Sequence, residues 1–108
     1  MSIRLTKQWL PLNKETVDQL KGELGVFQLA SEAEEITYVG VAGSRSQFGL
    51  RSEISKHLKK AVFFRTEVTS AYSTRFQELL MVHHADFGYY PALNSDSDTA
   101  KLGKLSPL

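Results

Sequence analysis

Two short runs rich in β-forming residues, joined by a polar connection, constrain the fold of this chain most strongly. The first run is 26–30, the second is 36–41, and the acidic segment "SEAEE" lies between them. A five-residue connection between two such runs is typical of a β-hairpin. A third run, "AVFFRTEVT" at 61–69, alternates in the manner of a strand. We therefore expect a sheet of three antiparallel strands, the third pairing with the hairpin.

Helical patterns occupy the segments around these strands. Asn13 is a candidate N-cap for a short helix over 14–21. The strongest helical pattern follows Ser70, a second candidate N-cap, and ends at Gly88. Between them, apolar residues recur every four positions from Gly49 onward (Leu50, Ile54 and Leu58). The order helix, hairpin, helix, strand, helix predicts an α+β fold, a small antiparallel three-stranded sheet flanked by helices.

The length of 108 residues is that of one domain with a modest core. We expect this domain to cover 1–94, with an N-terminal arm and helix in 1–24 and the remaining core in 25–94. The segment from Ser95 to the end has too little apolar content to pack, and we expect it to be a flexible tail.

Composition excludes several classes of function. The absence of cysteine excludes disulfides, thiolate zinc sites and a cysteine nucleophile. The formal net charge of +1 means that nucleic acid could be bound only through a local basic patch. No apolar run is long enough to cross a bilayer, and the first residues lack the long apolar core of a signal peptide. We therefore expect a cytoplasmic protein without membrane association, and no feature predicts its oligomeric state.

Two three-residue motifs add a functional expectation. "GVF" at 25–27 and "YVG" at 38–40 stand on the two arms of the expected hairpin, ten residues apart. This arrangement resembles the GIY-YIG nuclease family, and the later segment "ELLMVHHADFGYYPALN" is similar to the ending of that family's domain. Two departures stand out. Phe27 replaces the tyrosine of the first motif, and "AGSRSQFG" lengthens the connection that follows the second.

The resemblance implies a metal-dependent endonuclease that hydrolyses DNA phosphodiester bonds. It implies that Arg51 contacts the phosphate. Arg45 is the alternative candidate for this role, because the longer connection after the second motif allows either arginine to match the family's position. The resemblance also implies that Glu78 holds Mg²⁺ or Mn²⁺. The remaining residues that we expect to take part are Tyr38, which would activate the attacking water, His57, which would assist proton transfer, and Lys56, Lys59 and Asn94, which would help to bind nucleic acid.

Other interpretations of the same residues stay open. Phe27 lacks the hydroxyl of the tyrosine that it replaces in the first motif. This difference favours a catalytically inactive GIY-YIG-like module that binds nucleic acid or a protein partner. Glu78 follows Arg75 by three residues, the spacing of an ordinary helical ion pair. His83 and His84 point about 100° apart on a helix, so they cannot easily ligate one ion, and we expect His83 at the edge of the core.

Overall fold

The computed structural model describes residues 4–95 and 98. Along the chain its elements are β1 (Leu10–Pro11), α1 (Lys14–Asp18), β2 (Gly25–Ala30), β3 (Ile36–Ala42), α2 (Gly49–Ser55), β4 (Phe63–Val68) and α3 (Tyr72–Phe87). The α+β class expected from the sequence is confirmed. The expected flexible tail, 95–108, lies outside the described residues except for Ser95 and Asp98.

The sheet has four antiparallel strands in the order β1-β4-β2-β3. The expected pairing of the hairpin β2–β3 with β4 is confirmed, but the expected number of three strands is wrong. The additional strand, β1, pairs Leu10 with Phe64 and Pro11 with Phe63. Pro11 has no N–H to donate, which restricts it to an edge of the sheet, and so short a strand around a proline leaves no alternating pattern in the sequence.

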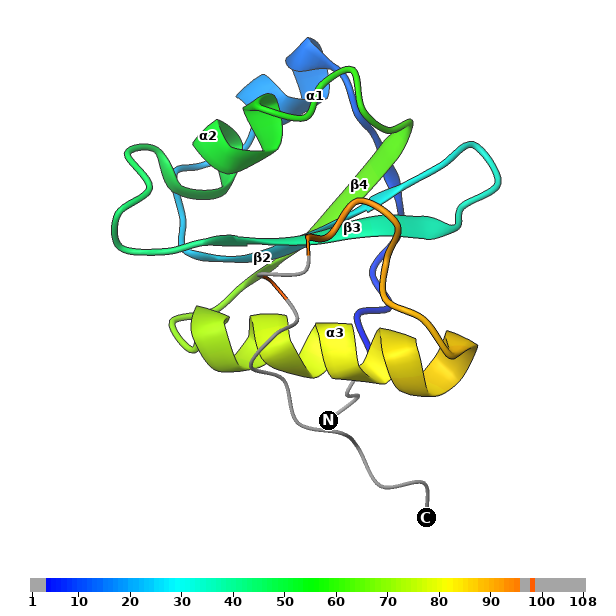
Figure 1. Cartoon of the computed structure of the whole chain (residues 1–108). Helices are drawn as coiled ribbons and strands as arrows, with labels where there is room; N and C mark the ends of the chain where they lie inside the picture. Colours follow the sequence, from blue (N-terminus) through cyan, green and yellow to red (C-terminus); the bar gives the residue numbers. More distant parts are fainter. Residues whose placement is uncertain (1–3, 96–97, 99–108) are drawn as a thin grey trace.

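Helices cover both faces of the sheet (Figure 1), with α1 and α2 on one face and α3 on the other. Side chains that alternate along β2 enter two different cores: Phe27 and Leu29 pack on the α1–α2 side, and Val26 packs on the α3 side. The N-terminal arm joins the two layers, because Leu5 belongs to the α3 core and Leu12 to the α1–α2 core.

The two motifs of the hairpin fit together sterically. Phe27 lies directly opposite Gly40 in the β2–β3 register. A Cβ added at Gly40 would overlap the ring of Phe27, which is only 1% exposed and cannot move aside. The glycine of "YVG" therefore leaves the space that the aromatic residue of the first motif fills.

Helix ends agree with the sequence in part. Thr16 donates its N–H to the Asn13 side chain (2.8 Å), which confirms the expected N-cap. The helix was expected to cover 14–21, but α1 ends at Asp18, and the next N–H, that of Gln19, donates to the Thr16 carbonyl three residues back (3.2 Å). The expected Ser70 cap is wrong, since Ala71 holds that position without a side-chain hydrogen bond. Gly88 ends α3 with φ 82°, as expected. Within the described residues, no helix has the length and apolar content needed to span a membrane.

Candidate nucleic-acid interface

Tyr38 and His57, two of the residues expected in the site, lie in contact. Tyr38 projects from β3 toward α2, and His57 follows the end of α2, where its N–H donates to the Ile54 carbonyl (2.9 Å). The two rings have centroids 4.8 Å apart and are tilted by 36°. The Phe27 ring packs against both, with centroids 5.9 Å away in each case. The fold thus holds a phenol and an imidazole in a fixed mutual position.

The surroundings keep both of these groups uncharged near neutral pH. Burial raises the pKa of the Tyr38 phenol, and the negative charges of Asp98 and Glu53 raise it further. Burial also lowers the pKa of the His57 imidazole, assisted by Lys60 and opposed by Glu53. The pair therefore offers a phenol O–H donor beside a neutral imidazole that can accept a proton.

Glu53 is part of this cluster although the sequence analysis did not single it out. Its carboxylate accepts hydrogen bonds from Ser46 Oγ (2.9 Å) and Lys56 Nζ (3.1 Å). Ser46 in turn closes the turn that follows β3, because its Oγ accepts from the Gly43 N–H (3.2 Å). The sequence feature that could have predicted this is the four-residue spacing of Glu53 and His57, because residues four apart lie on the same side of a helix.

Arg51 lies on the other flank of α2. It precedes Glu53 by two residues, which corresponds to about 200° around a helix. Its guanidinium stacks on the Phe48 ring, 5.4 Å from the centroid. Arg45, the alternative arginine, is exposed in the turn next to Ser46. The structure therefore brings Tyr38 and His57 into contact, whereas the guanidinium of Arg51 stacks on Phe48.

Positive charge is concentrated in the segment 43–60, here called the basic segment, which comprises the turn after β3, α2 and the residues after α2. It contains five lysines and arginines and one carboxylate, Glu53, so its net charge is +4, whereas the whole chain carries +1. Four of the cationic side chains are exposed and Arg51 is half-buried (Arg45, Lys56, Lys59 and Lys60 are the exposed ones). Exposed cationic side chains are therefore concentrated in one segment of the chain.

Asn94 lies on the outer edge of β3. Its Oδ1 accepts from the Val39 N–H and its Nδ2 donates to the Val39 carbonyl, both at 2.9 Å. The amide thus pairs with the backbone as a neighbouring strand would, and the orange segment in Figure 1 runs beside β3 at this point. Nδ2 also donates to Asp98 (3.1 Å), which brings that carboxylate close to Tyr38. Asn94 therefore supports the strand that carries the tyrosine.

Glu78 lies in α3, on the face of the sheet opposite α2 (Figure 1). Arg75 Nη1 donates to Glu78, and Arg75 Nε and Nη2 donate to Glu67 on β4 (2.8 and 3.0 Å). The helical ion pair considered as the alternative interpretation is present, and a second carboxylate strengthens it. The Arg75 side chain is only 11% exposed, and the hydrogen bonds that it donates to Glu67 raise its pKa. The sheet thus separates Glu78 from Tyr38.

The residues around Glu78 are a poor fit for a divalent metal ion. Mg²⁺ and Mn²⁺ are held by carboxylate oxygens and water. Here Arg75 occupies the space between the two carboxylates, and it would have to leave before a cation could bind. Within residues 4–95 and 98, no group of three or more His, Cys, Asp or Glu side chains is arranged to hold a metal ion.

Comparison with known proteins gives a family without an assigned activity. No curated protein and no solved structure matches this chain. The family described as a domain of unknown function, DUF7508, matches residues 3–86, a range that includes Tyr38, the basic segment and Glu78 but not Asn94. The chain therefore belongs to the DUF7508 family.

Proposed function

We propose that this chain is a GIY-YIG-like module that binds nucleic acid through its phosphates without cutting it. The basic segment carries the proposal, because its net charge of +4 is concentrated in eighteen residues of a chain with a net charge of +1. Exposed lysines and arginines bind the phosphate backbone by releasing its counterions, and this interaction requires no particular base sequence.

Tyr38 and His57 supply polar groups beside those cations. A phenol O–H can donate to a phosphate oxygen, and a neutral imidazole can donate from one nitrogen and accept at the other. Both rings can also stack on an unpaired base, which favours single-stranded nucleic acid. Burial lowers the pKa of His57, and Lys60 and Lys56, which belong to the same basic segment, lie close enough to lower it further.

Two observations support binding without cleavage. Phe27 has no hydroxyl, and its ring is fully enclosed over Gly40. Glu78, which the resemblance makes the ligand of Mg²⁺ or Mn²⁺, pairs with Arg75 on the other face of the sheet. A phosphate bound beside Tyr38 would therefore lack the carboxylate that the resemblance assigns to the reaction.

The second candidate is the endonuclease itself, and the contact between Tyr38 and His57 favours it. Because burial lowers the pKa of His57, the imidazole is free to take a proton from an attacking water near neutral pH. Tyr38, 4.8 Å away between ring centroids, could then donate a hydrogen bond to the phosphate. This candidate predicts cleavage that depends on both residues.

One experiment separates the two candidates. Fluorescein-labelled single-stranded DNA, duplex DNA and RNA are titrated with the protein and followed by anisotropy, and plasmid and branched DNA are incubated with it in Mg²⁺ or Mn²⁺. Binding without cleavage supports the module. Cleavage that is lost in Tyr38→Phe and in His57→Ala supports the endonuclease.

The triple variant Lys56→Ala/Lys59→Ala/Lys60→Ala provides the residue-level test, and Lys7→Ala/Lys14→Ala/Lys21→Ala is its control with the same change in net charge. We expect at least a tenfold loss of affinity in the first variant only, on the order of 1.4 kcal/mol. Equal losses in both variants would mean that net charge alone is responsible, and absence of binding by the wild type would refute the proposed function.

A further inference from the structure

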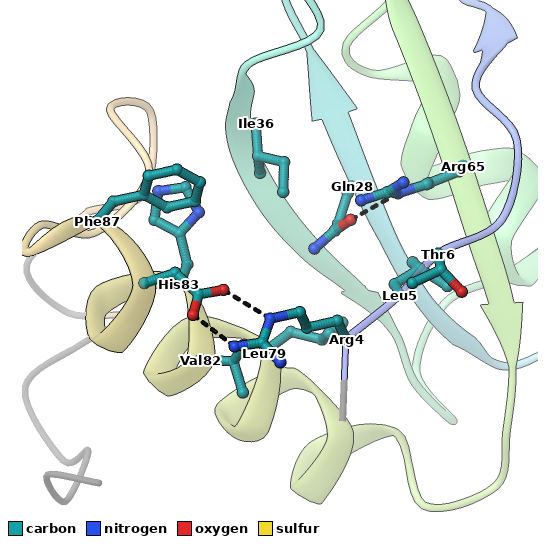
Figure 2. A pocket seen from close by; sticks show the side chains of 11 residues that line it. Arg4, Leu5, Thr6, Gln28, Ile36, Arg65, Leu79, Val82, His83 and Phe87 are labelled. Atoms are coloured by element: carbon teal, nitrogen blue, oxygen red, sulfur yellow. Dashed lines mark hydrogen bonds and ion pairs between the residues drawn. The ribbon is translucent and has the colours of Figure 1, made fainter. Parts of the chain in front are cut away.

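A cavity on the α3 side of the sheet has the features of a ligand site that is independent of the basic segment. It lies between β2, the N-terminal arm and the second half of α3, and its volume is about 320 Å³ (Figure 2). A second hollow of about 350 Å³ shares Arg65, His83 and Phe87 with it and extends to Trp9. Volumes of this size are at the lower end of those found for small-molecule pockets.

His83 is the first unusual feature of this cavity. Its side chain is 5% exposed, and neither ring nitrogen has a hydrogen-bond partner among the described residues. The ring packs against Phe87 (centroids 4.7 Å apart) and Tyr89 (5.7 Å). Buried polar atoms are nearly always paired in folded proteins, so two unpaired nitrogens on a cavity wall point to a bound group that pairs with them.

Arg65 and Gln28 supply the second unusual feature. Gln28, 3% exposed, accepts at Oε1 from Arg65 Nε (2.8 Å), and Figure 2 shows its amide nitrogen pointing into the space toward α3. The Arg65 guanidinium also donates to the Lys7 carbonyl (3.2 Å) and stacks on Trp9 at 4.0 Å. These direct partners are all neutral.

The charges around the cavity leave one cation without a direct counter-ion. Asp86, the carboxylate on the wall, is occupied by Arg4 through two hydrogen bonds (2.8 and 2.6 Å). No carboxylate forms a salt bridge with Arg65 within the part of the chain that the structure describes, although Glu34 and Glu35 line the second hollow and Glu34 acts on Arg65 through its charge. A partly buried guanidinium without a direct counter-ion favours the binding of an anion.

We propose that this cavity binds a small organic carboxylate with an apolar body. The carboxylate pairs with the guanidinium of Arg65 and the amide N–H of Gln28, and the body lies against the ring of Phe87. A polar group on the body pairs with the His83 imidazole. Four further residues of the wall are apolar, which suits an aliphatic or aromatic body (Leu5, Ile36, Leu79 and Val82), and Thr6 and the Arg4–Asp86 pair complete the lining.

Trp9 reports on this site directly, because it is the only tryptophan of the chain and it stacks on Arg65. The full chain is titrated with two acids that carry a hydroxyl on the body, 4-hydroxyphenylacetate and 6-hydroxyhexanoate, and with the neutral counterparts 2-(4-hydroxyphenyl)ethanol and 1,6-hexanediol. We expect a saturable change in Trp9 fluorescence with the acids, and at least tenfold weaker binding of the alcohols. Isothermal titration calorimetry repeats each measurement without relying on Trp9.

Two variants assign the site. Arg65→Gln should remove the preference for the acids over the alcohols, and His83→Phe should weaken both acids at least fivefold, whereas His84→Phe should bind as the wild type does. Circular dichroism of each variant verifies that it is folded. The proposal is overturned if the wild type shows no saturation by either acid up to about 10 mM, or if folded Arg65→Gln keeps the preference for the acids.

Discussion

Replacing His83 by leucine measures how much the two unpaired imidazole nitrogens destabilise the unliganded fold. A buried donor or acceptor without a partner costs about 1–3 kcal/mol, and His83 has two such nitrogens. The leucine loses the ring contacts with Phe87 and Tyr89, which are worth about 0.5–1.5 kcal/mol each. The difference predicts a net stabilisation of about 1–3 kcal/mol, or a rise in Tm of roughly 5–15 °C for a domain of this size.

The assay is urea denaturation at pH 7.5, followed by far-ultraviolet circular dichroism, on the wild type and on His83→Leu. His84→Leu is the matched control: that side chain is only half-buried, with its ring 4.6 Å from Tyr90, and its stability should change by less than about 1 kcal/mol. A folded His83→Leu variant that is less stable than the wild type would refute the reasoning, because it would mean that the imidazole makes a favourable polar interaction in the unliganded protein.

The pH dependence of stability gives the same prediction an independent readout. Burial lowers the pKa of His83 below its ordinary value of 6.5. The unfolded chain therefore binds protons that the folded chain does not as the pH falls below about 6.5, and the free energy of unfolding decreases with acidification. His57, whose pKa is also lowered, contributes with the same sign. His83→Leu should reduce this decrease between pH 7.5 and 5.5, and an unchanged pH profile would contradict it.

Two further predictions concern the hairpin. Gly40→Ala should lower the free energy of unfolding by about 1–3 kcal/mol, since its Cβ would overlap the enclosed Phe27 ring, and the loss should shrink in a Phe27→Leu background when the double-mutant cycle is measured by denaturation. Asn94→Ala removes two hydrogen bonds to Val39 and should destabilise the fold by about 1–3 kcal/mol. Hydrogen exchange measured by NMR should then be faster at the Val39 amide, and unchanged protection there would show that Asn94 is dispensable.

Local features of the fold were predictable from the sequence because they depend on neighbouring residues. Asn13 caps α1 and Gly88 ends α3 for reasons confined to one helical turn. β1 was missed because two residues around Pro11 form a strand only through pairing with β4. The Ser70 cap was wrong because α3 begins at Tyr72, one residue later than expected, which places Ala71 at the N-cap position.

The candidate sites depend on which faces of the sheet the helices cover, and this is a tertiary property. Spacing along the chain could associate Glu53 with His57, but it could not place Glu78 on the opposite side of the sheet from Tyr38. The cavity could not be predicted from the sequence, because its lining residues come from the N-terminal arm, three strands and α3.

The salt dependence of nucleic-acid binding tests the central claim most directly. Each phosphate contact contributes about 0.7 to the slope of log affinity against log salt for single strands. If the basic segment binds the phosphates, the wild type should show a slope of magnitude about 2–4 with single-stranded DNA. In the Lys56/Lys59/Lys60 alanine variant the magnitude of the slope should decrease by about 2. In the Lys7/Lys14/Lys21 alanine variant the slope should equal that of the wild type. A slope that is unchanged by the first variant would contradict the account.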